Sequence, residues 1–445
     1  MSDHVILLSI PGLREQALKW MPNLASLEGD RATLVPSAPA VTCPVQVNMT
    51  TGETPSEHGI VANGLYDREK DELEMWTAWN SAVERPQIWD RLREAAPGVT
   101  TAVWFPLLVK GCAADFICTP APIHNPDGSE SLWCYTKPEA MYGKLLEALG
   151  HFPLQHFWGP MANIEGSRWI VSSANWLMER EKPNFLYLYL PHLDYAAQKH
   201  GPNSPEAQQA CSDLDVEIGR LMDHSNRVLE GSDPLWLVAS EYAITEVNHN
   251  VAPNRVLREA GLLQVKLDQD GRELIDGKAS SAWALADHQH SHVYVRDSDP
   301  TTISHVVDLF RKCEGIAQVW SGEELERHGV AHARSGEVVL ISESWSWQSY
   351  YYWLDEAMAP AFARTVDIHR KPGYDPVELF WDPALAKQHG GGVPLDASLV
   401  KGSHGAPADA DEQRGVMLSS ATGVFVERTM SDIDVCEMVL RQFGV

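Results

Sequence analysis

Thr42 stands at a position where a hydroxyl could act on a phosphoryl group. It follows the loop Pro39-Ala40-Val41 and opens a predicted helix. A helix N-terminus offers unpaired N–H groups and the positive end of the helix dipole to an anion. The amide of Asn63 could donate to the same oxygens. A free threonine hydroxyl is a weak nucleophile, so a metal ion or a base has to activate it. Taken alone, Thr42 fits better as a simple helix N-cap.

A histidine-rich run offers candidate metal ligands. It reads Asp287-His288-Gln289-His290-Ser291-His292, and in a strand its three histidines would share one face as a ladder of ligands. The alternative is a solvated strand edge or a set of hydrogen-bonded histidines. That alternative is favoured for His290 and His292, whereas the two interpretations are balanced for Asp287 and His288.

Two further clusters each have a binding interpretation and a structural one. His369 and Arg370 belong to the turn His369-Arg370-Lys371-Pro372-Gly373. They could clamp a phosphate or carboxylate, or form an ordinary surface turn. The aromatic residues between Trp345 and Trp353 could wall a pocket for a base or an acyl chain, but core packing is the more common role of such a run.

The segment from Pro39 to Asp67 resembles the nucleophile region of the nucleotide pyrophosphatase/phosphodiesterase branch of the alkaline phosphatase superfamily, the type I phosphodiesterases. The resemblance rests on Thr42 after a proline-rich loop, on the Thr-Gly and His-Gly-Ile steps downstream, and on the spacing from Thr42 to Asn63. It implies that Thr42 is a catalytic nucleophile and that Asn63 contacts the substrate. With the whole segment matched, the nucleophile interpretation is favoured over the N-cap.

Two later segments resemble metal-binding motifs of the same family. Asp194 begins a segment similar to the family's Asp-x-x-x-His-x-x-Gly-Pro motif, and His404 lies in Gly402-Ser403-His404-Gly405, which is similar to its Gly-Thr-His-Gly motif. The resemblance covers roughly residues 4–245 and 400–445. It implies an alkaline-phosphatase-like α/β fold and divalent metal ions, with Asp194 and His404 among the ligands.

Several expected metal-ligand positions are altered. Pro11 stands where the family has an aspartate after the first strand, Gln198 replaces the histidine of the Asp194 motif, and Glu241-Tyr242 replaces Asp-His in the Ser-Asp-His-Gly loop. Zinc sites usually need three or four nitrogen, sulfur or carboxylate ligands. The remaining oxygen-rich set suits Mg²⁺ or Mn²⁺ as well as Zn²⁺. The candidate ligands are Asp194, Gln198, Glu241, Asp287, His288 and His404.

Two functions from different classes follow. The first is metal-dependent hydrolysis of a small phosphodiester, phosphomonoester or phosphonate through a covalent intermediate on Thr42. The second is a protein that keeps the fold but has lost hydrolysis, and serves in small-ligand binding or assembly. Because Thr42, Asn63, Asp194 and His404 are all retained, the enzyme is favoured.

The order of the predicted elements agrees with an α/β fold. Apolar runs at Val5–Ile10, Thr101–Leu107, Phe185–Leu190 and Pro234–Ala239 alternate with helical patterns. Such alternation predicts a mostly parallel sheet with helices on both faces, and ligands then bind beyond the carboxyl ends of the strands. Residues 1–250 and 396–445 are predicted to form this core, and 251–395 an inserted cap. The chain is predicted to close with a strand at Gly423–Val426 and a helix at Ile433–Phe443.

The composition narrows the partners. The 445 residues carry a formal net charge of −26, which disfavours a nucleic acid polymer or an anionic membrane as a partner but leaves room for a small anionic substrate. The first residues lack the features of a secretory signal, and no apolar run is long enough to span a membrane. Seven cysteines without a Cys-x-x-Cys pair indicate neither disulfides nor a thiolate metal site. We therefore expect a cytoplasmic protein, and a homodimer is one expected arrangement.

Overall fold

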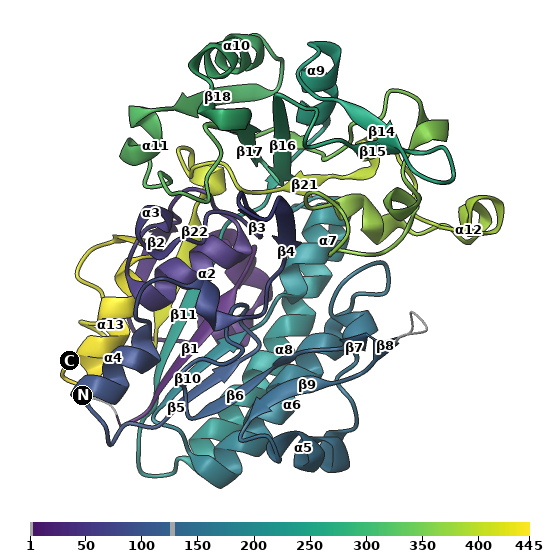
Figure 1. Cartoon of the computed structure of the whole chain (residues 1–445). Coiled ribbons are helices and arrows are strands. Elements are labelled where there is room, and N and C mark those ends of the chain that lie inside the picture. The colour runs from purple at the N-terminus through teal and green to yellow at the C-terminus, as the bar shows by residue number, and fades with distance from the viewer. Residues whose placement is uncertain (1–2, 125–129) are drawn as a thin grey trace.

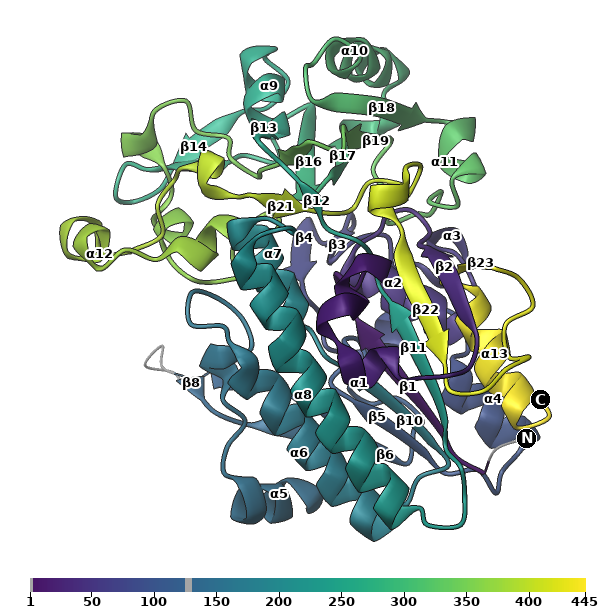
Figure 2. The same ribbon diagram turned by 180° about the vertical axis from the view of Figure 1, so that it is seen from behind.

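The computed structural model describes residues 3–124 and 130–445, and its main element is a nine-stranded sheet (Figures 1 and 2). Across the sheet the strands are β23 (Thr429–Ser431), β2 (Arg31–Val35), β22 (Gly415–Ser419), β11 (Leu235–Ser240), β1 (Val5–Ile10), β10 (Phe185–Tyr189), β5 (Thr101–Trp104), β6 (Phe116–Pro120) and β9 (Cys134–Lys137). The five strands from β11 to β6 run parallel, and β22 and β9 pair antiparallel at either side. The predicted mostly parallel sheet is confirmed.

Helices cover both faces of this sheet, because alternate side chains of each buried strand point to opposite sides. On β1, Ile6 and Leu8 pack with α6 (Ile164–Glu181) and α8 (Pro205–Val228), together with α5 (Met141–Leu149). Val5 and Leu7 pack with α2 (Thr42–Thr51), α4 (Ile88–Ala95) and α13 (Asp434–Gln442). Within the part of the chain that the structure describes, no helix is both long and apolar enough to cross a bilayer.

A second lobe lies over the edge of the sheet at which β1, β10 and β11 end (Figures 1 and 2). Its antiparallel sheet has the order β16 (Ala282–Asp287), β17 (His290–Val295), β19 (Val338–Ser342) and β18 (Ile316–Ser321). Its helices are α9 (Pro253–Glu259), α10 (Pro300–Phe310), α11 (Glu323–Arg327) and α12 (Pro383–His389). This lobe corresponds to the predicted cap, although the predicted boundaries at 250 and 396 stay a prediction.

The aromatic run of the lobe is part of its core. Trp347 and the four residues Tyr350 to Trp353 are buried and pack with the strands of the lobe sheet. Trp345, in contrast, is 39% exposed. Core packing was the favoured interpretation of this run, and it is correct for all but the first residue.

Short elements connect the lobe to the core. The remaining helices are α1 (Pro22–Ala25), α3 (Pro55–His58) and α7 (His192–His200). The small two-stranded sheets are β3 (Gly64–Asp67) with β4 (Glu72–Met75), β7 (Ile123–His124) with β8 (Glu130–Ser131), β12 (Thr245–Glu246) with β21 (Gly402–Ser403), β13 (His249–Val251) with β20 (Ser346–Gln348), and β14 (Val265–Leu267) with β15 (Glu273–Ile275). Through β12 and β21 the chain enters and leaves the lobe next to α7.

The predicted closing strand at Gly423–Val426 is wrong. The backbone N–H groups of Val424 and Phe425 donate to the carboxylate of Asp30, at 2.6 and 2.8 Å, instead of to a neighbouring strand. The strands near the C-terminus are β22 and β23, on either side of this loop. The predicted closing helix is confirmed as α13.

Candidate active site

Thr42 is the first residue of α2, and its hydroxyl opens into a cleft between the core and the lobe. Val41 before it is extended, and Pro44 sits in the first turn, where a missing N–H costs no helical hydrogen bond. Every residue of α2 is buried, so the helix is fixed in the core and its N-terminus is held in place. Oγ1 of Thr42 lies 3.0 Å from the hydroxyl oxygen of Tyr242.

Asn63 lies beside Thr42, as predicted, but its amide is already bonded. Its Oδ1 accepts from the backbone N–H of Cys43 at 2.9 Å, and its Nδ2 donates to Oδ1 of Asp287 at 3.0 Å. Asp287 also accepts the backbone N–H of Asn63 at 2.9 Å. Asn63 therefore links α2 to β16 of the lobe, and only the second hydrogen of its NH₂ group remains to reach a substrate oxygen.

Asp287 makes the stability of the protein depend on pH. Burial raises the pKa of this carboxyl from 3.8 to about 7, and the two hydrogen bonds from Asn63 oppose that rise. The folded protein thus keeps a proton that the unfolded chain has lost, so the free energy of unfolding falls as pH rises through this range.

We expect Asp287→Asn to reduce that fall, measured by urea unfolding between about pH 4 and about pH 8, by an amount on the order of 1–3 kcal/mol. The exposed Asp411 (95% exposed side chain) provides a control, because Asp411→Asn should leave the pH dependence unchanged. Equal slopes for Asp287→Asn and wild type would contradict the buried proton.

Asp194 and His404 come together at the predicted place. Asp194 lies in the first turn of α7 and His404 follows β21, with 4.0 Å between Oδ1 of Asp194 and Nε2 of His404. Both atoms are buried without a hydrogen-bond partner. Burial raises the pKa of Asp194 to about 7 and lowers that of His404 to about 3. Nδ1 of His404 donates to the carbonyl of Ala40 at 2.8 Å, so Nε2 carries the lone pair that a cation could take.

Gln198 lies one turn after Asp194 on α7 and is fully buried. Its Oε1 accepts from the hydroxyl of Tyr374 at 2.6 Å, while its Nε2 has no partner. The amide oxygen expected to face a metal ion is therefore occupied by a phenol. Tyr374 was not among the predicted site residues, although it lies only three positions after the turn that contains Arg370 and Lys371.

Glu241 and Tyr242 follow β11 and reach opposite sides of the same region. Oε1 of Glu241 accepts from Ser9 at 2.6 Å and from Gln46 at 2.8 Å, and Oε2 has no partner. Burial raises the pKa of Glu241 to about 8, which the hydrogen bonds from Ser9 and Gln46 oppose. Tyr242 is also buried, and burial holds the pKa of its phenol well above 10.

Four rings stack next to Thr42, and we call them the ring column: Tyr242, His404, His288 and Tyr374. The Tyr242 and His404 rings are 3.5 Å apart and nearly parallel, at 5°. The His288 ring lies 3.7 Å from the His404 ring and 3.7 Å from the Tyr374 ring. The column brings together four distant segments, and two of its members are aromatic residues that the sequence did not mark as functional.

The predicted histidine ladder is wrong, because the chain turns within it. His288 and Gln289 form the two-residue connection between β16 and β17, and His288 has a left-handed backbone (φ +59°). His292 is hydrogen-bonded on both nitrogens, to the carbonyl of Val61 and the N–H of Gly336, in agreement with the structural interpretation. Both nitrogens of His290 are buried without a partner.

The donor set fits one metal ion better than two. Among the described residues no group of three or more His, Cys, Asp or Glu side chains could hold an ion. Beside Thr42, the predicted set offers only Glu241, whose Oε1 is already doubly bonded, because Pro11 has no ligand atom. Asp194 and His404 both present an unpartnered buried atom, so they could hold a single ion whose other ligands come from solvent or substrate.

The cleft above Thr42 has a volume of about 1330 Å³ and is mostly aromatic. Thr42, Asp194, His288 and Tyr374 line its inner end. The aromatic residues along its walls are Trp76, Trp79, Trp133, Tyr135, Phe157, Trp158, Tyr189 and Tyr195. The charged or basic residues that also line it are Glu74, Lys110, Asp367, His369 and Arg370.

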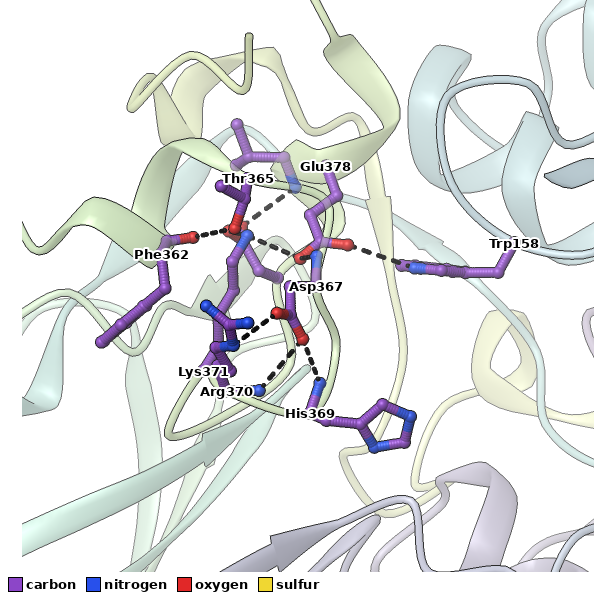
Figure 3. A network of polar contacts seen from close by, with 10 residues as sticks. Trp158, Phe362, Thr365, Asp367, His369, Arg370, Lys371 and Glu378 are labelled. Atoms are coloured by element: carbon purple, nitrogen blue, oxygen red, sulfur yellow. Dashed lines mark hydrogen bonds and ion pairs between the residues drawn. The ribbon is translucent and has the colours of Figure 1, made fainter. Parts of the chain in front are cut away.

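One wall of the cleft is the loop with residues 366–370, and a buried ion cluster holds it (Figure 3). Nζ of Lys371 lies 2.8 Å from Asp375 and 2.6 Å from Glu378, and all three side chains are almost completely buried. Glu378 in turn accepts the backbone N–H of Asp367 at 3.1 Å and the indole N–H of Trp158 at 3.2 Å. The cluster thus joins the loop to the opposite aromatic wall.

His369 and Arg370 occupy the mouth of this cleft, as Figure 3 shows for the turn that carries them. Nε of Arg370 pairs with Asp367 at 3.0 Å, and its side chain is 74% exposed. Nδ1 of His369 donates to the carbonyl of Met75 at 3.1 Å. The turn is therefore a surface turn that also borders the cleft, and its role in binding an anion stays a prediction.

A model of the type I phosphodiesterase/nucleotide pyrophosphatase family matches residues 5–375. The chain belongs to this family. The family consists of phosphoric ester hydrolases, so the predicted enzyme class is confirmed at that level. An uncharacterised pyrophosphatase/phosphodiesterase of Schizosaccharomyces pombe is 25% identical over 226 residues, which are 49% of this chain and 40% of that protein. The chain thus matches less than half the length of that curated family member.

Solved structures show the same type I phosphodiesterase fold. Phosphonoacetate hydrolase from Sinorhizobium meliloti, in complex with phosphonoformate, has a TM-score of 0.65 and 16% identity over 99% of this chain and 96% of its own. Murine ectonucleotide pyrophosphatase/phosphodiesterase 5 has a TM-score of 0.62 and 15% identity over 99% of this chain and 95% of its own. These likenesses confirm the predicted alkaline-phosphatase-like fold.

Proposed function

We propose that this chain hydrolyses a small phosphate ester or phosphonate, and that Thr42 receives the phosphoryl group. The observation that carries the proposal is the hydroxyl of Thr42 at the exposed N-terminus of an otherwise buried helix, at the inner end of the cleft. The N–H groups and dipole of α2 would bind the phosphoryl oxygens. The ligands of the structural neighbours agree with an anionic substrate, since one is bound to phosphonoformate and an inactive threonine-to-alanine variant of another is bound to AMP.

The reaction would proceed in two displacements. Oγ1 of Thr42 forms a bond to phosphorus while the bond from phosphorus to the leaving group breaks, and the leaving group departs with the proton that Thr42 loses. Water then adds to phosphorus, and the bond to Oγ1 breaks to regenerate the threonine. Tyr242 holds the hydroxyl of Thr42 before the first step.

Asp194 and His404 would hold a single divalent ion, Mn²⁺, Mg²⁺ or Zn²⁺. Two unpartnered ligand atoms 4.0 Å apart support this assignment. When bound, such an ion polarises a phosphoryl oxygen and lowers the pKa of a bound water. Asp194 has to lose its proton to bind the ion, and because its pKa is raised to about 7, ion affinity should increase with pH through neutrality.

The direct test is to trap the intermediate. Purified protein with Mn²⁺, Mg²⁺ or Zn²⁺ is mixed with bis(p-nitrophenyl) phosphate, release of nitrophenol is followed, and the reaction is quenched in acid for peptide mass spectrometry. We expect a phosphoryl adduct on the peptide that contains Thr42. Turnover with no adduct at Thr42 at any quench time would argue against the covalent route, and absence of turnover across a panel of esters would favour the ligand-binding alternative.

The aromatic walls predict a preference for a bulky apolar leaving group. Trp158 lies with ring centroids 5.4 Å from both Tyr195 and Tyr374, so removing its indole opens one wall of the cleft. For Trp158→Ala we expect kcat/KM for a naphthyl ester to fall roughly tenfold more than kcat/KM for a methyl ester. Trp345→Ala, outside the cleft, should change neither value. An equal loss for both esters in Trp158→Ala would show that the cleft does not read the organic group.

Several predictions remain as they were. A cytoplasmic location, a homodimer and the lack of a nucleic acid partner stay predictions, and so does the choice among the three metal ions.

A further inference from the structure

The half of the site around Thr42 departs from the family pattern in its chemistry. By the family resemblance, the positions of Pro11, Glu241 and Tyr242 should supply metal ligands next to the nucleophile. Proline has no ligand atom, and the only other carboxylate oxygen of Glu241 is used twice, by Ser9 and Gln46. Neutral phenols are poor metal ligands, and burial keeps Tyr242 neutral.

Tyr242 itself is held firmly toward Thr42. Its hydroxyl contacts Oγ1 of Thr42 at 3.0 Å, and its ring lies flat against the ring of His404 at 3.5 Å. The backbone carbonyl of Tyr242 accepts the N–H of Gly12, directly after Pro11, at 2.9 Å. The loop after β1, which would present the missing aspartate, thus anchors the tyrosine through its backbone instead.

We propose that the Thr42 half of the site takes no metal ion and that Tyr242 is a positioning residue that holds the Thr42 hydroxyl in its place. The chain would then bind at most one ion, at Asp194 and His404. The inference rests on the proposed function only in treating Thr42 as the phosphate-site residue. The ring column completes the arrangement, because His404 orients Tyr242 on one face and contacts His288 on the other.

The first test counts ions and does not depend on turnover. Wild type, Asp194→Ala/His404→Ala and Pro11→Asp/Tyr242→His are dialysed against Mn²⁺ or Zn²⁺, and bound metal per chain is measured by mass spectrometry. We expect at most one equivalent in wild type, none in Asp194→Ala/His404→Ala, and one more than wild type in Pro11→Asp/Tyr242→His. Two equivalents in wild type would overturn the proposal. So would one equivalent that survives in Asp194→Ala/His404→Ala, a result that is readable even if Pro11→Asp/Tyr242→His fails to fold.

The second test asks whether the hydroxyl of Tyr242 positions Thr42. Orthovanadate binding to wild type and Tyr242→Phe is measured by calorimetry, since vanadate forms a bond with a nucleophilic hydroxyl. We expect the affinity to fall about tenfold, as for one lost hydrogen bond, while the metal content stays at the wild-type value. Tyr350→Phe is the matched control, because the buried hydroxyl of Tyr350 has no partner and lies outside the cleft. An unchanged vanadate affinity in Tyr242→Phe would overturn the positioning role, and unchanged metal content with lost hydrolysis alone would not rescue it.

Discussion

Replacing Thr42 by alanine should lower kcat by about 10³-fold or more while leaving the fold intact. The nucleophile is lost outright, and what remains is binding at the helix N-terminus. The side chain of Thr42 makes one hydrogen bond, to Tyr242, so the variant should lose only about 1 kcal/mol of stability. Initial rates with a nitrophenyl ester, together with a thermal unfolding curve, give both quantities.

Two variants make the Thr42 result specific. Thr42→Ser keeps a hydroxyl at the same position and should retain measurable turnover. Thr51→Ala removes a hydroxyl from the other end of α2, where it donates to the carbonyl of Val47 at 2.7 Å, and should cost stability without costing catalysis. If Thr42→Ala turned over at the rate of Thr51→Ala, the nucleophile would have to be sought elsewhere.

The sequence predicted the core of the site because its motifs follow strands of one parallel sheet. Asp194 follows β10 and Glu241 follows β11, and both strands pair with β1. Parallel neighbours end at the same edge, so residues just after them must meet there. His404 and Asn63 were placed by the family resemblance, since neither follows a strand of the central sheet.

The parts that could not be predicted depend on contacts between distant segments. Neither Tyr242 nor Tyr374 differs by residue type from the many buried tyrosines of the chain, and only stacking with His404 and His288 gives them a place in the site. The turn at His288 and Gln289 lacks the glycine or asparagine that usually marks a two-residue hairpin connection. The period-two pattern therefore continued through it, and the ladder was predicted where the chain reverses.

Lys371 carries the largest expected effect on stability. Burial alone would lower the pKa of Lys371, but Asp375 and Glu378 outweigh it and raise that pKa. In Lys371→Met, two carboxylates stay buried with no cation, which typically costs about 3–5 kcal/mol. Urea unfolding at neutral pH measures this loss. The exposed pair of Lys70 and Asp67, 2.7 Å apart, is the control, and Lys70→Met should cost no more than about 1 kcal/mol.

The loss in Lys371→Met should also depend on pH in a defined direction. Burial raises the pKa of Glu378, and Lys371 opposes that rise, so removing the lysine raises this pKa further. Below the new pKa the carboxyl is protonated and no buried charge remains unpaired, so the deficit should shrink as pH falls toward about 5 and grow toward about 8. Adding Asp375→Asn and Glu378→Gln to Lys371→Met should recover most of the stability, because buried charges replaced together cost little.

The same substitution connects stability to the cleft. Glu378 holds both the N–H of Asp367 and the indole of Trp158, so a carboxyl that has lost its lysine should loosen the two walls together. KM for a bulky ester should therefore rise in Lys371→Met at a temperature where the variant is still folded, while Lys70→Met leaves KM unchanged. A stability loss as small as that of Lys70→Met, or one that does not vary with pH, would show that the buried cluster is not held together by its charges.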